Sequence, residues 1–283
     1  MRREVLNLPA GWEGRLWQHR PHGGGVAVHR HAELEVNLTL AGRATYLVDE
    51  QRYDLAPGTM IWLHPQQAHV LVHESADHAM WIGVFRPRLL HRVCTTPATR
   101  ELRRARPTGV FCKQLGREAG GRLHALFADV AACEADMARY NAGLPFALLS
   151  AWALHVDADE LSAGVDVHPA VERAARLLRD IAEPMSVEHL ALEAGLSPSR
   201  LSRLFKQQTG VSLTHYRQRQ QLQRYFELYG SGQRRTCMQA ALEAGFGSYP
   251  QFHRVFKSHL GYGPAEHRQR LRRGGPSRGR GGY

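Results

Sequence analysis

The first third of the chain alternates apolar and polar residues over short runs. Between Gly11 and about Arg86 these runs are separated by Gly and Pro residues, and they read VAVH, LEVNLTL, ATYLV, TMIWL, AHVLV and AMWIGVF. An alternation with a period of two is typical of strands with one buried face. We therefore predict an antiparallel sandwich or barrel in this part of the chain.

The pattern then changes to the period of a helix. Leu115 to Arg139 and Pro145 to His155 are predicted to be helical. Their apolar stripes are Leu123, Leu126, Phe127 and Val130 in the first helix, and Phe146, Leu149, Trp152 and Ala153 in the second. The arginine-rich segment from Pro87 to Val110 follows neither period, and we expect it to be irregular and to cross the surface.

A longer pattern occurs twice near the C-terminus. Ala191 to Gly210 reads ALEAGLSPSRLSRLFKQQTG, and Ala241 to Gly261 reads ALEAGFGSYPQFHRVFKSHLG. The two copies share ALEAG, RLFK in one corresponds to RVFK in the other, and Gly247 is the one inserted residue. An internal repeat defines the structural unit, so both copies are expected to fold in the same way.

Each copy predicts a helix, a turn and a second helix. Glycine ends the first helix, and Ser197 or Ser248 follows where an N-cap oxygen is needed. A short turn between two helices is the arrangement of the DNA-binding helix-turn-helix. The buried face of the second helix is expected to hold Leu201, Leu204 and Phe205 in one copy, and Phe252, Val255 and Phe256 in the other.

The opposite face of each second helix is polar and basic. It holds Ser199, Ser202, Arg203 and Lys206 in the first copy, and Pro250, His253, Arg254 and Lys257 in the second. Short and cationic side chains suit a helix lying in a DNA major groove, where arginine contacts guanine O6 and N7 together. A duplicated helical hairpin with a merely solvated basic face is the alternative.

The residues of these faces are expected to differ in role. Arg203 and Arg254 are the first candidates for reading base edges. Arg200, Lys206, Gln251 and Lys257 are better placed for phosphates or flanking edges.

Charge is distributed unevenly along the 283 residues. The residues up to Val167 hold 18 Lys+Arg and 18 Asp+Glu, whereas the rest hold 19 and 8, so the formal net charge of +11 belongs to the second part. A neutral part joined to a basic part indicates one domain that binds a polyanion and one with another task.

Other sequence features narrow the class of protein. The N-terminal residues contain no apolar core of a signal peptide, and no run approaches the length of a transmembrane helix. The four cysteines, Cys94, Cys112, Cys133 and Cys237, are scattered without C-x-x-C spacing. We therefore expect a cytoplasmic protein with no membrane partner, whose thiols are reduced and buried or idle; a redox sensor is the alternative.

The repeat carries a family resemblance. Ala240 to Arg268 closely resembles the C-terminal signature of the AraC/XylS family of bacterial transcription regulators, through Gly-Phe, a serine, F-x-R-x-F-K and G-x-x-P. The first copy matches through S-x-x-L-S-R-L-F-K and T-G-V-S-L. The chain departs from the family at His267, where tyrosine is usual, and in the joining helix, QLQRYFELYGSG. The resemblance covers roughly Pro169 to Leu271 and implies a regulator that binds double-stranded DNA.

A second constellation lies within the predicted strands. His29, His31 and Glu35 match the spacing of the first cupin motif, and His69 follows Gly58 as in the second cupin motif. The segment thus resembles a cupin barrel, which in AraC-type regulators commonly senses an effector. Residues two apart on a strand face the same way, so these side chains can converge.

The residues of this barrel are compatible with more than one occupant. Two or three imidazoles and a carboxylate suit a divalent transition metal, whereas a remnant cupin motif can instead serve hydrogen bonding or a small organic effector. Trp62, Trp81, Tyr46 and Tyr53 are aromatic candidates for the pocket wall. No catalytic residue is assigned. A metal-dependent cupin enzyme with an appended DNA-binding domain is the alternative function.

Together these observations predict an α+β protein of two domains. We expect a cupin-like barrel over residues 1–110, a helical dimerisation or covering segment over 111–157, a linker over 158–168, a double helix-turn-helix domain over 169–273 and a disordered basic tail over 274–283. The resemblance implies DNA, a small-molecule effector, RNA polymerase and a second copy of the chain as partners.

Overall fold

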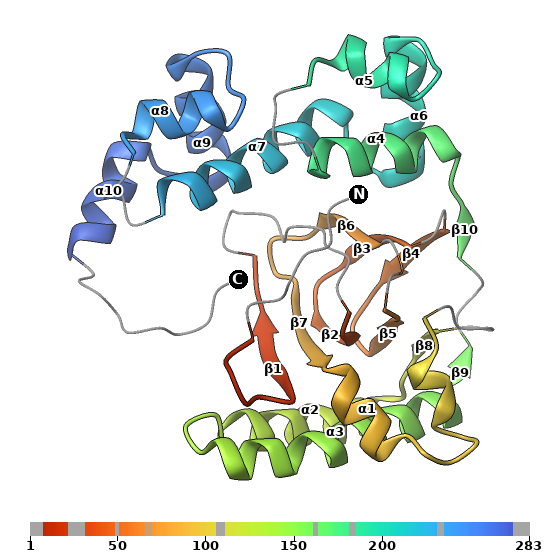
Figure 1. Cartoon of the computed structure of the whole chain (residues 1–283). Helices are drawn as coiled ribbons and strands as arrows, with labels where there is room; N and C mark the ends of the chain where they lie inside the picture. The colour runs from red at the N-terminus through yellow and green to blue at the C-terminus, as the bar shows by residue number, and fades with distance from the viewer. Residues whose placement is uncertain are drawn as a thin grey trace. The chain divides into compact units, whose positions relative to one another are not determined.

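The computed structural model describes residues 8–21, 32–48, 51–65, 67, 69–105, 111–160, 164–180, 185–230 and 235–273. The chain divides into two compact units, with the main boundary between Asp166 and Val167. The first unit is rich in strands and the second is helical (Figure 1), as the α+β prediction requires.

Two antiparallel sheets form the first unit. One has the order β1 (Gly14–His19), β7 (Ala79–Phe85), β2 (Leu34–Ala41), β5 (Thr59–Leu63), β8 (Cys112–Gln114) and β9 (Asp159–Glu160). The other has the order β10 (Val165–Asp166), β4 (Gln51–Leu55), β3 (Ala44–Val48) and β6 (His69–Glu74). The strand prediction is confirmed for the runs that form β2, β3, β5, β6 and β7. The predicted run VAVH, residues 26–29, lies outside the described residues.

Alternation along β2 separates an apolar face from a polar one. Leu34, Val36 and Leu38 belong to the core that includes side chains of the helices after the strands. The residues between them, Glu35 and Asn37, face the other way and are buried as well. Asn37 Nδ2 donates to the hydroxyl of Tyr46 on β3 at 3.3 Å, so this polar face is directed at the second sheet.

Helices cover the outer, apolar face of the larger sheet (Figure 1). They are α2 (Arg117–Ala131) and α3 (Met137–Asp157). Phe127 on α2 and Leu144 on α3 are completely buried in the shared core. The hydroxyl of Tyr140 on α3 also accepts a 2.8 Å hydrogen bond from the backbone N–H of Leu16 on β1. Burial raises the pKa of Tyr140 to about 12, so this hydroxyl stays neutral.

The predicted helix boundaries in this segment were wrong. The first helix ends at Ala131, and α3 begins at Met137, eight residues before Pro145. Asp136 caps α3 by accepting hydrogen bonds from the N–H groups of Ala138 and Arg139. The proline was taken as a helix start, but here the helix continues through it.

The segment after β7 is also more regular than expected. It forms α1 (Pro87–Val93) and a 3₁₀ turn, η1 (Arg100–Arg103). Leu89, Leu90 and Leu102 are buried, so the arginines lie on a segment that is anchored to the core by leucines. The expectation of an irregular segment was therefore wrong, whereas the exposure of Arg88, Arg92, Arg100 and Arg103 agrees with the expected surface position.

Two of the aromatic residues expected in the pocket lie elsewhere. Trp62 packs against Trp152 of α3, with ring centroids 5.5 Å apart. Trp81 packs against Phe127 of α2 and donates its indole N–H to His124 Nδ1 at 2.7 Å. Trp62 pairs with Val36 and Trp81 pairs with Leu38 across neighbouring strands, and paired residues point to the same face of a sheet. Both tryptophans therefore lie on the outer face, with Val36 and Leu38.

The four cysteines are free thiols. Cys94 and Cys112 are buried, and burial raises their pKa values to about 11 and about 12. A thiol with so high a pKa is protonated near neutral pH and is a poor nucleophile. The prediction of buried or idle thiols is confirmed for this pair.

The second unit consists of helices. They are α4 (Pro169–Asp180), α5 (Val187–Glu193), α6 (Pro198–Thr209), α7 (Leu213–Tyr229), α8 (Cys237–Glu243), α9 (Tyr249–Leu260) and α10 (Pro264–Arg273). In Figure 1, α7 runs between the group α4 to α6 and the group α8 to α10. No helix in the described ranges is long and apolar enough to cross a membrane.

Both copies of the repeat fold into the predicted helix-turn-helix. Ser197 accepts a hydrogen bond from the N–H of Arg200, and Ser248 accepts one from the N–H of Gln251, so the two serines cap α6 and α9. Gly210 and Gly261 end these helices with φ of 80° and 78°, a left-handed conformation that glycine adopts without a steric cost.

The unusual joining helix supplies the core of the second copy. The ring centroids of Tyr225 on α7 and Phe252 on α9 lie 4.6 Å apart, and those of Tyr225 and Phe256 lie 5.8 Å apart. His267, the other departure from the family pattern, stacks on Tyr262 at 6.0 Å. Aromatic side chains of α7, α9 and α10 thus hold the second copy together.

Replacing Phe252 with alanine tests this core. Phe252 is completely buried, so Phe252→Ala should lower the free energy of unfolding of the second unit by about 3–5 kcal/mol. All five tryptophans precede Val167. Urea unfolding should therefore be followed by far-UV circular dichroism for this unit and by tryptophan fluorescence for the first.

The exposed Lys257 on the same helix provides the control, and Lys257→Ala should change stability by less than about 0.5 kcal/mol. Equal stability of the Phe252→Ala and Lys257→Ala proteins would contradict the role of Phe252 in the core.

Candidate nucleic-acid interface and the polar interior of the first unit

The exposed side of α6 is basic along its length. Ser199, Arg200, Arg203 and Lys206 are exposed, and Ser202 is half-buried. On the opposite side, Leu201 and Phe205 are completely buried, whereas Leu204 is half-buried. Because the apolar side is fixed in the core, the arginines and the lysine of α6 are held facing solvent.

Helix α9 repeats this arrangement. Pro250, His253, Arg254 and Lys257 are exposed, and the buried side holds Phe252, Val255 and Phe256. Gln251 is half-buried, and its Oε1 accepts a 2.9 Å hydrogen bond from the N–H of Gly247. The carbonyl of Gln251 is thus engaged in the turn, which leaves its amide nitrogen as the group for an outside partner.

The cationic groups on these two helices are not neutralised by the residues that the structure describes. Arg200, Arg203 and Lys206 of α6, and Arg254 and Lys257 of α9, form no ion pair within the described ranges. Other arginines of the second unit do pair, such as Arg235 with Glu243 at 2.8 Å. The cations of α6 and α9 are thus exposed and without an ion pair among the described residues.

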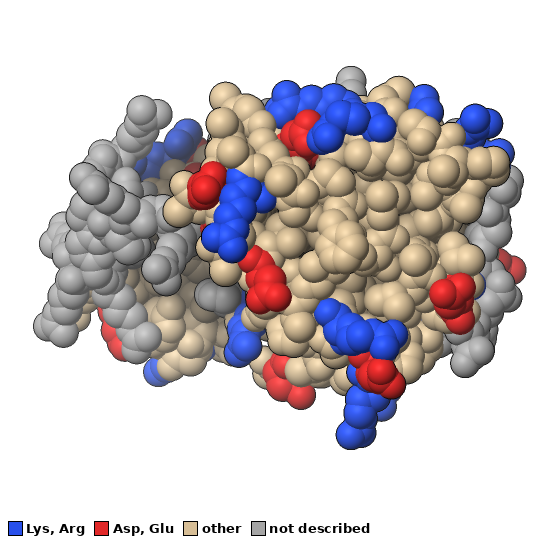
Figure 2. Space-filling view, turned by 90° about the horizontal axis from the view of Figure 1, so that it is seen from below, with Lys and Arg blue, Asp and Glu red and all other residues tan. Residues whose placement is uncertain are grey.

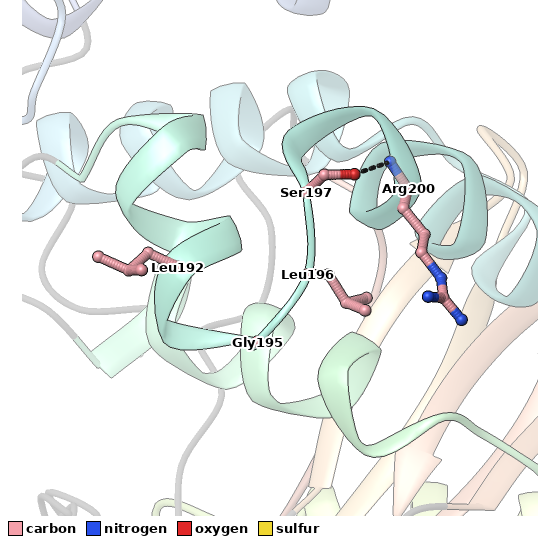
Figure 3. Close-up of a pocket in the computed structure, with 5 residues that line it drawn as sticks. All are labelled: Leu192, Gly195, Leu196, Ser197 and Arg200. Atoms are coloured by element: carbon pink, nitrogen blue, oxygen red, sulfur yellow. Dashed lines mark hydrogen bonds between the residues drawn. The ribbon is translucent and has the colours of Figure 1, made fainter.

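A hollow lies at the turn of the first copy. It has a volume of about 340 Å³ and is lined by Leu192, Gly195, Leu196, Ser197 and Arg200. Figure 3 shows the side chains of Leu196 and Arg200 extending on the same side of the turn. Leu192 is 75% exposed, and Leu242 at the same position of the second copy is 42% exposed.

Sequence reasoning did not single out these leucines. The repeated ALEAG could have revealed them, because its leucine recurs in both copies although it is buried in neither. An exposed leucine at the same place in both copies of the repeat is an apolar contact point beside each basic helix.

The polar face inside the first unit brings together some of the predicted barrel residues. His69 Nε2 lies 4.0 Å from Glu35 Oε2, and both side chains are buried. Asn37 Nδ2 donates to Glu35 Oε1 at 2.7 Å. His29 and His31 lie outside the described residues, so the structure describes only the Glu35 and His69 part of the predicted set.

Tyr46 is the aromatic residue that does face this interior. Burial, followed by the charges of Glu35 and Glu74, raises the pKa of its hydroxyl well above the usual value. The hydroxyl is therefore a neutral donor and acceptor beside buried carboxylates. Tyr53 pairs with Tyr46 in the strand register and is half-buried.

Comparison with known proteins identifies the class. A model described as an AraC-like ligand binding domain matches residues 17–137, and a model described as a helix-turn-helix domain matches residues 190–270. Together they cover both units, and the chain belongs to the AraC-type transcription regulators, with a ligand-binding domain followed by a DNA-binding domain.

Its relatives include named regulators. The chain is 27% identical over 242 residues to the arabinose operon regulatory protein of Salmonella typhimurium, which covers 82% of each chain. It is 27% identical over 240 residues to the Escherichia coli protein of the same name, covering 82% of this chain and 79% of that one. It is 22% identical over 265 residues to the uncharacterised HTH-type regulator YfiF of Bacillus subtilis, covering 88% and 80%.

Alanine substitution of the two central arginines tests the interface. Arg203→Ala or Arg254→Ala should each weaken binding to a specific DNA site by about 1–3 kcal/mol and relax the base preference at a few positions, because a base contact is lost. Fluorescence anisotropy against the site and its single-base variants measures both effects.

Arg122→Ala is the matched control, since it removes the same charge from an exposed position on α2 in the other unit. An equal loss of affinity for every DNA sequence would show that Arg203 and Arg254 contact only phosphates.

Proposed function

We propose that α6 and α9 enter successive major grooves on one side of a DNA duplex. The observation that carries this proposal is the repetition of an exposed basic face on two equivalent helices. Arg203 and Arg254 would read base edges, and Arg200, Lys206 and Lys257 would contact phosphates, with Gln251 donating its amide.

The length of α7 supports this arrangement. A helix of 17 residues spans about 25 Å, and the two helix-turn-helix copies attach near its two ends. Successive major grooves on one face of B-form DNA lie about 34 Å apart. A spacer of this length, with a helix pair at each end, is of the right order to serve two neighbouring grooves.

The first unit would sense a small molecule. Its interior offers Glu35, Asn37, Tyr46 and His69, a set of buried donors and acceptors suited to a small polar effector. The predicted metal at His29, His31, Glu35 and His69 stays a prediction. An effector bound there would favour whichever arrangement of the protein binds it more tightly. It could change the fraction of protein that is able to bind DNA only as far as its affinities for the two arrangements differ. This role is regulatory rather than catalytic, and it belongs in the bacterial cytoplasm.

A homodimer is the proposed assembly, formed through α3. Phe146 is 65% exposed, and Ala142, Leu149, Ala153 and Val156 continue one stripe at spacings of four and three residues. The opposite face of α3 is used in covering the sheet, so the stripe is free for a second copy. Figure 2 shows a broad area without charged side chains, bordered by charged ones, on the side of the molecule that lies at the bottom of Figure 1.

RNA polymerase is the proposed protein partner at a promoter. The exposed Leu192 and Leu242 lie on α5 and α8, beside the helices proposed to occupy the grooves. Apolar side chains in these positions suit a contact with a protein bound to the adjacent DNA.

An altered operator tests the two-groove arrangement. Genome-wide mapping of the DNA that the protein occupies provides a natural site with two contacted segments. Inserting about five base pairs between these segments turns one away by half a helical turn. The affinity of the protein for this DNA should fall by more than about tenfold, as it should when the second segment is replaced by an unrelated sequence.

The same five base pairs inserted outside the site are the control and should have no effect. If the internal insertion left affinity unchanged, α6 and α9 would not be engaged together.

A charge on α3 tests the dimer. Phe146→Asp should convert a dimer to a monomer in analytical ultracentrifugation, because a carboxylate would be buried in the apolar contact. Val165→Asp is the matched control, since Val165 on β10 is also 65% exposed. A Phe146→Asp protein that stayed dimeric would remove α3 from the interface.

A further inference from the structure

A second polar cluster in the first unit consists of residues that the cupin motifs do not indicate. It is formed by His19 at the end of β1, Glu74 at the end of β6 and His78 just before β7. His19 Nε2 lies 2.8 Å from Glu74 Oε2, and His78 Nδ1 lies 3.1 Å from the same oxygen. One potential ligand atom from each residue lies within 4.8 Å of the other two.

The cluster is almost completely withdrawn from solvent. The exposed fractions of the side chains are 12% for His19, 5% for Glu74 and 0% for His78. Nε2 of His78 is buried and has no hydrogen-bond partner within the described part of the chain. A buried carboxylate needs a cation or several donors, and a buried ring nitrogen needs a partner.

Two imidazoles and one carboxylate are a ligand set for transition metals. Zinc binds imidazole nitrogen and carboxylate oxygen at about 2.0–2.2 Å, and tetrahedral geometry then places ligand atoms about 3.3 Å apart. The distances of 2.8 and 3.1 Å to Glu74 Oε2 are slightly shorter than this. An ion would replace the two protons shared with Glu74, and the two imidazole nitrogens, which lie within 4.8 Å of each other, would move to the same ion.

The alternative is a triad held by hydrogen bonds alone, in which both imidazoles donate to Glu74. That arrangement uses one nitrogen of His78 and leaves its buried Nε2 unpaired among the described residues. An ion held through Nδ1 would leave Nε2 in the same position. What favours an ion is the convergence of two imidazoles and one carboxylate, all nearly buried, from the ends of three strands.

We propose that His19, Glu74 and His78 bind one divalent transition-metal ion, with zinc as the reference ion. Three protein ligands leave one coordination position open for water or for an oxygen or nitrogen of an effector. The site shares no residue with His29, His31, Glu35 and His69. It joins β1 and the start of β7, which belong to one sheet, to β6 of the other sheet.

Zinc binding by the full-length protein tests the proposal. The protein is prepared without a histidine tag, stripped with a chelator and titrated with zinc chloride in competition with a chromogenic chelator. Glu74→Gln and His19→Gln should each remove one equivalent of bound zinc or lower the affinity for it by more than about 100-fold. A residue that only contacts a zinc ligand costs less than this when it is replaced. Glu35→Gln should retain that equivalent.

Two exposed residues of the same unit serve as controls. Glu134→Gln and His91→Ala change the same residue types away from the cluster and should bind zinc as the wild-type protein does. X-ray absorption of the cobalt-loaded protein gives a separate readout, because His19→Gln should reduce the number of imidazole ligands by one. Circular dichroism and tryptophan fluorescence establish that each variant is folded.

Equal zinc content in the wild type and in folded Glu74→Gln and His19→Gln proteins, including no zinc in any of them, would overturn the proposal. Loss of the zinc through Glu35→Gln, with retention in Glu74→Gln, would assign the ion to the cupin-motif residues instead.

Discussion

Burial of one apolar face on α6 and on α9 is the constraint on which the DNA-binding unit depends. Leu201 and Phe205 fix the rotation of α6 about its axis, and Phe252 and Phe256 fix that of α9. Each helix turns by about 100° per residue, so a fixed apolar face also fixes the direction of the arginines. The outward direction of the cations is thus a consequence of packing, because they face solvent only while the phenylalanines stay inside.

In the first unit, both faces of strand β2 are buried. Successive residues of β2 serve two compartments: Leu34 and Val36 belong to the core shared with the helices, and Glu35 and Asn37 line the interior between the sheets. A strand buried on both faces can be apolar on one and polar on the other only if the polar groups find partners. Asn37 Nδ2 donates to Glu35 and to Tyr46, and these hydrogen bonds satisfy part of that need.

Much of this could be predicted from sequence, and the misses have physical reasons. The α6 and α9 faces followed from helical spacing because capping serines and terminal glycines marked both ends of these helices. Trp62 and Trp81 were misplaced because period-two alternation gives two faces without saying which one meets the helices. The cluster of His19, Glu74 and His78 joins three strand ends, and its residues are separated by up to 59 positions, so only the sheet topology brings them together.

The stripe on α3 has a consequence for the geometry of any pair of these helices. Ala142, Phe146, Leu149, Ala153 and Val156 recur every 3.5 residues on average, slightly less than the 3.6 of a straight helix. Two such stripes in continuous contact would wind around each other with a left-handed twist. Because they extend over only about 21 Å, the association would be weak enough to vary with the concentration of the protein.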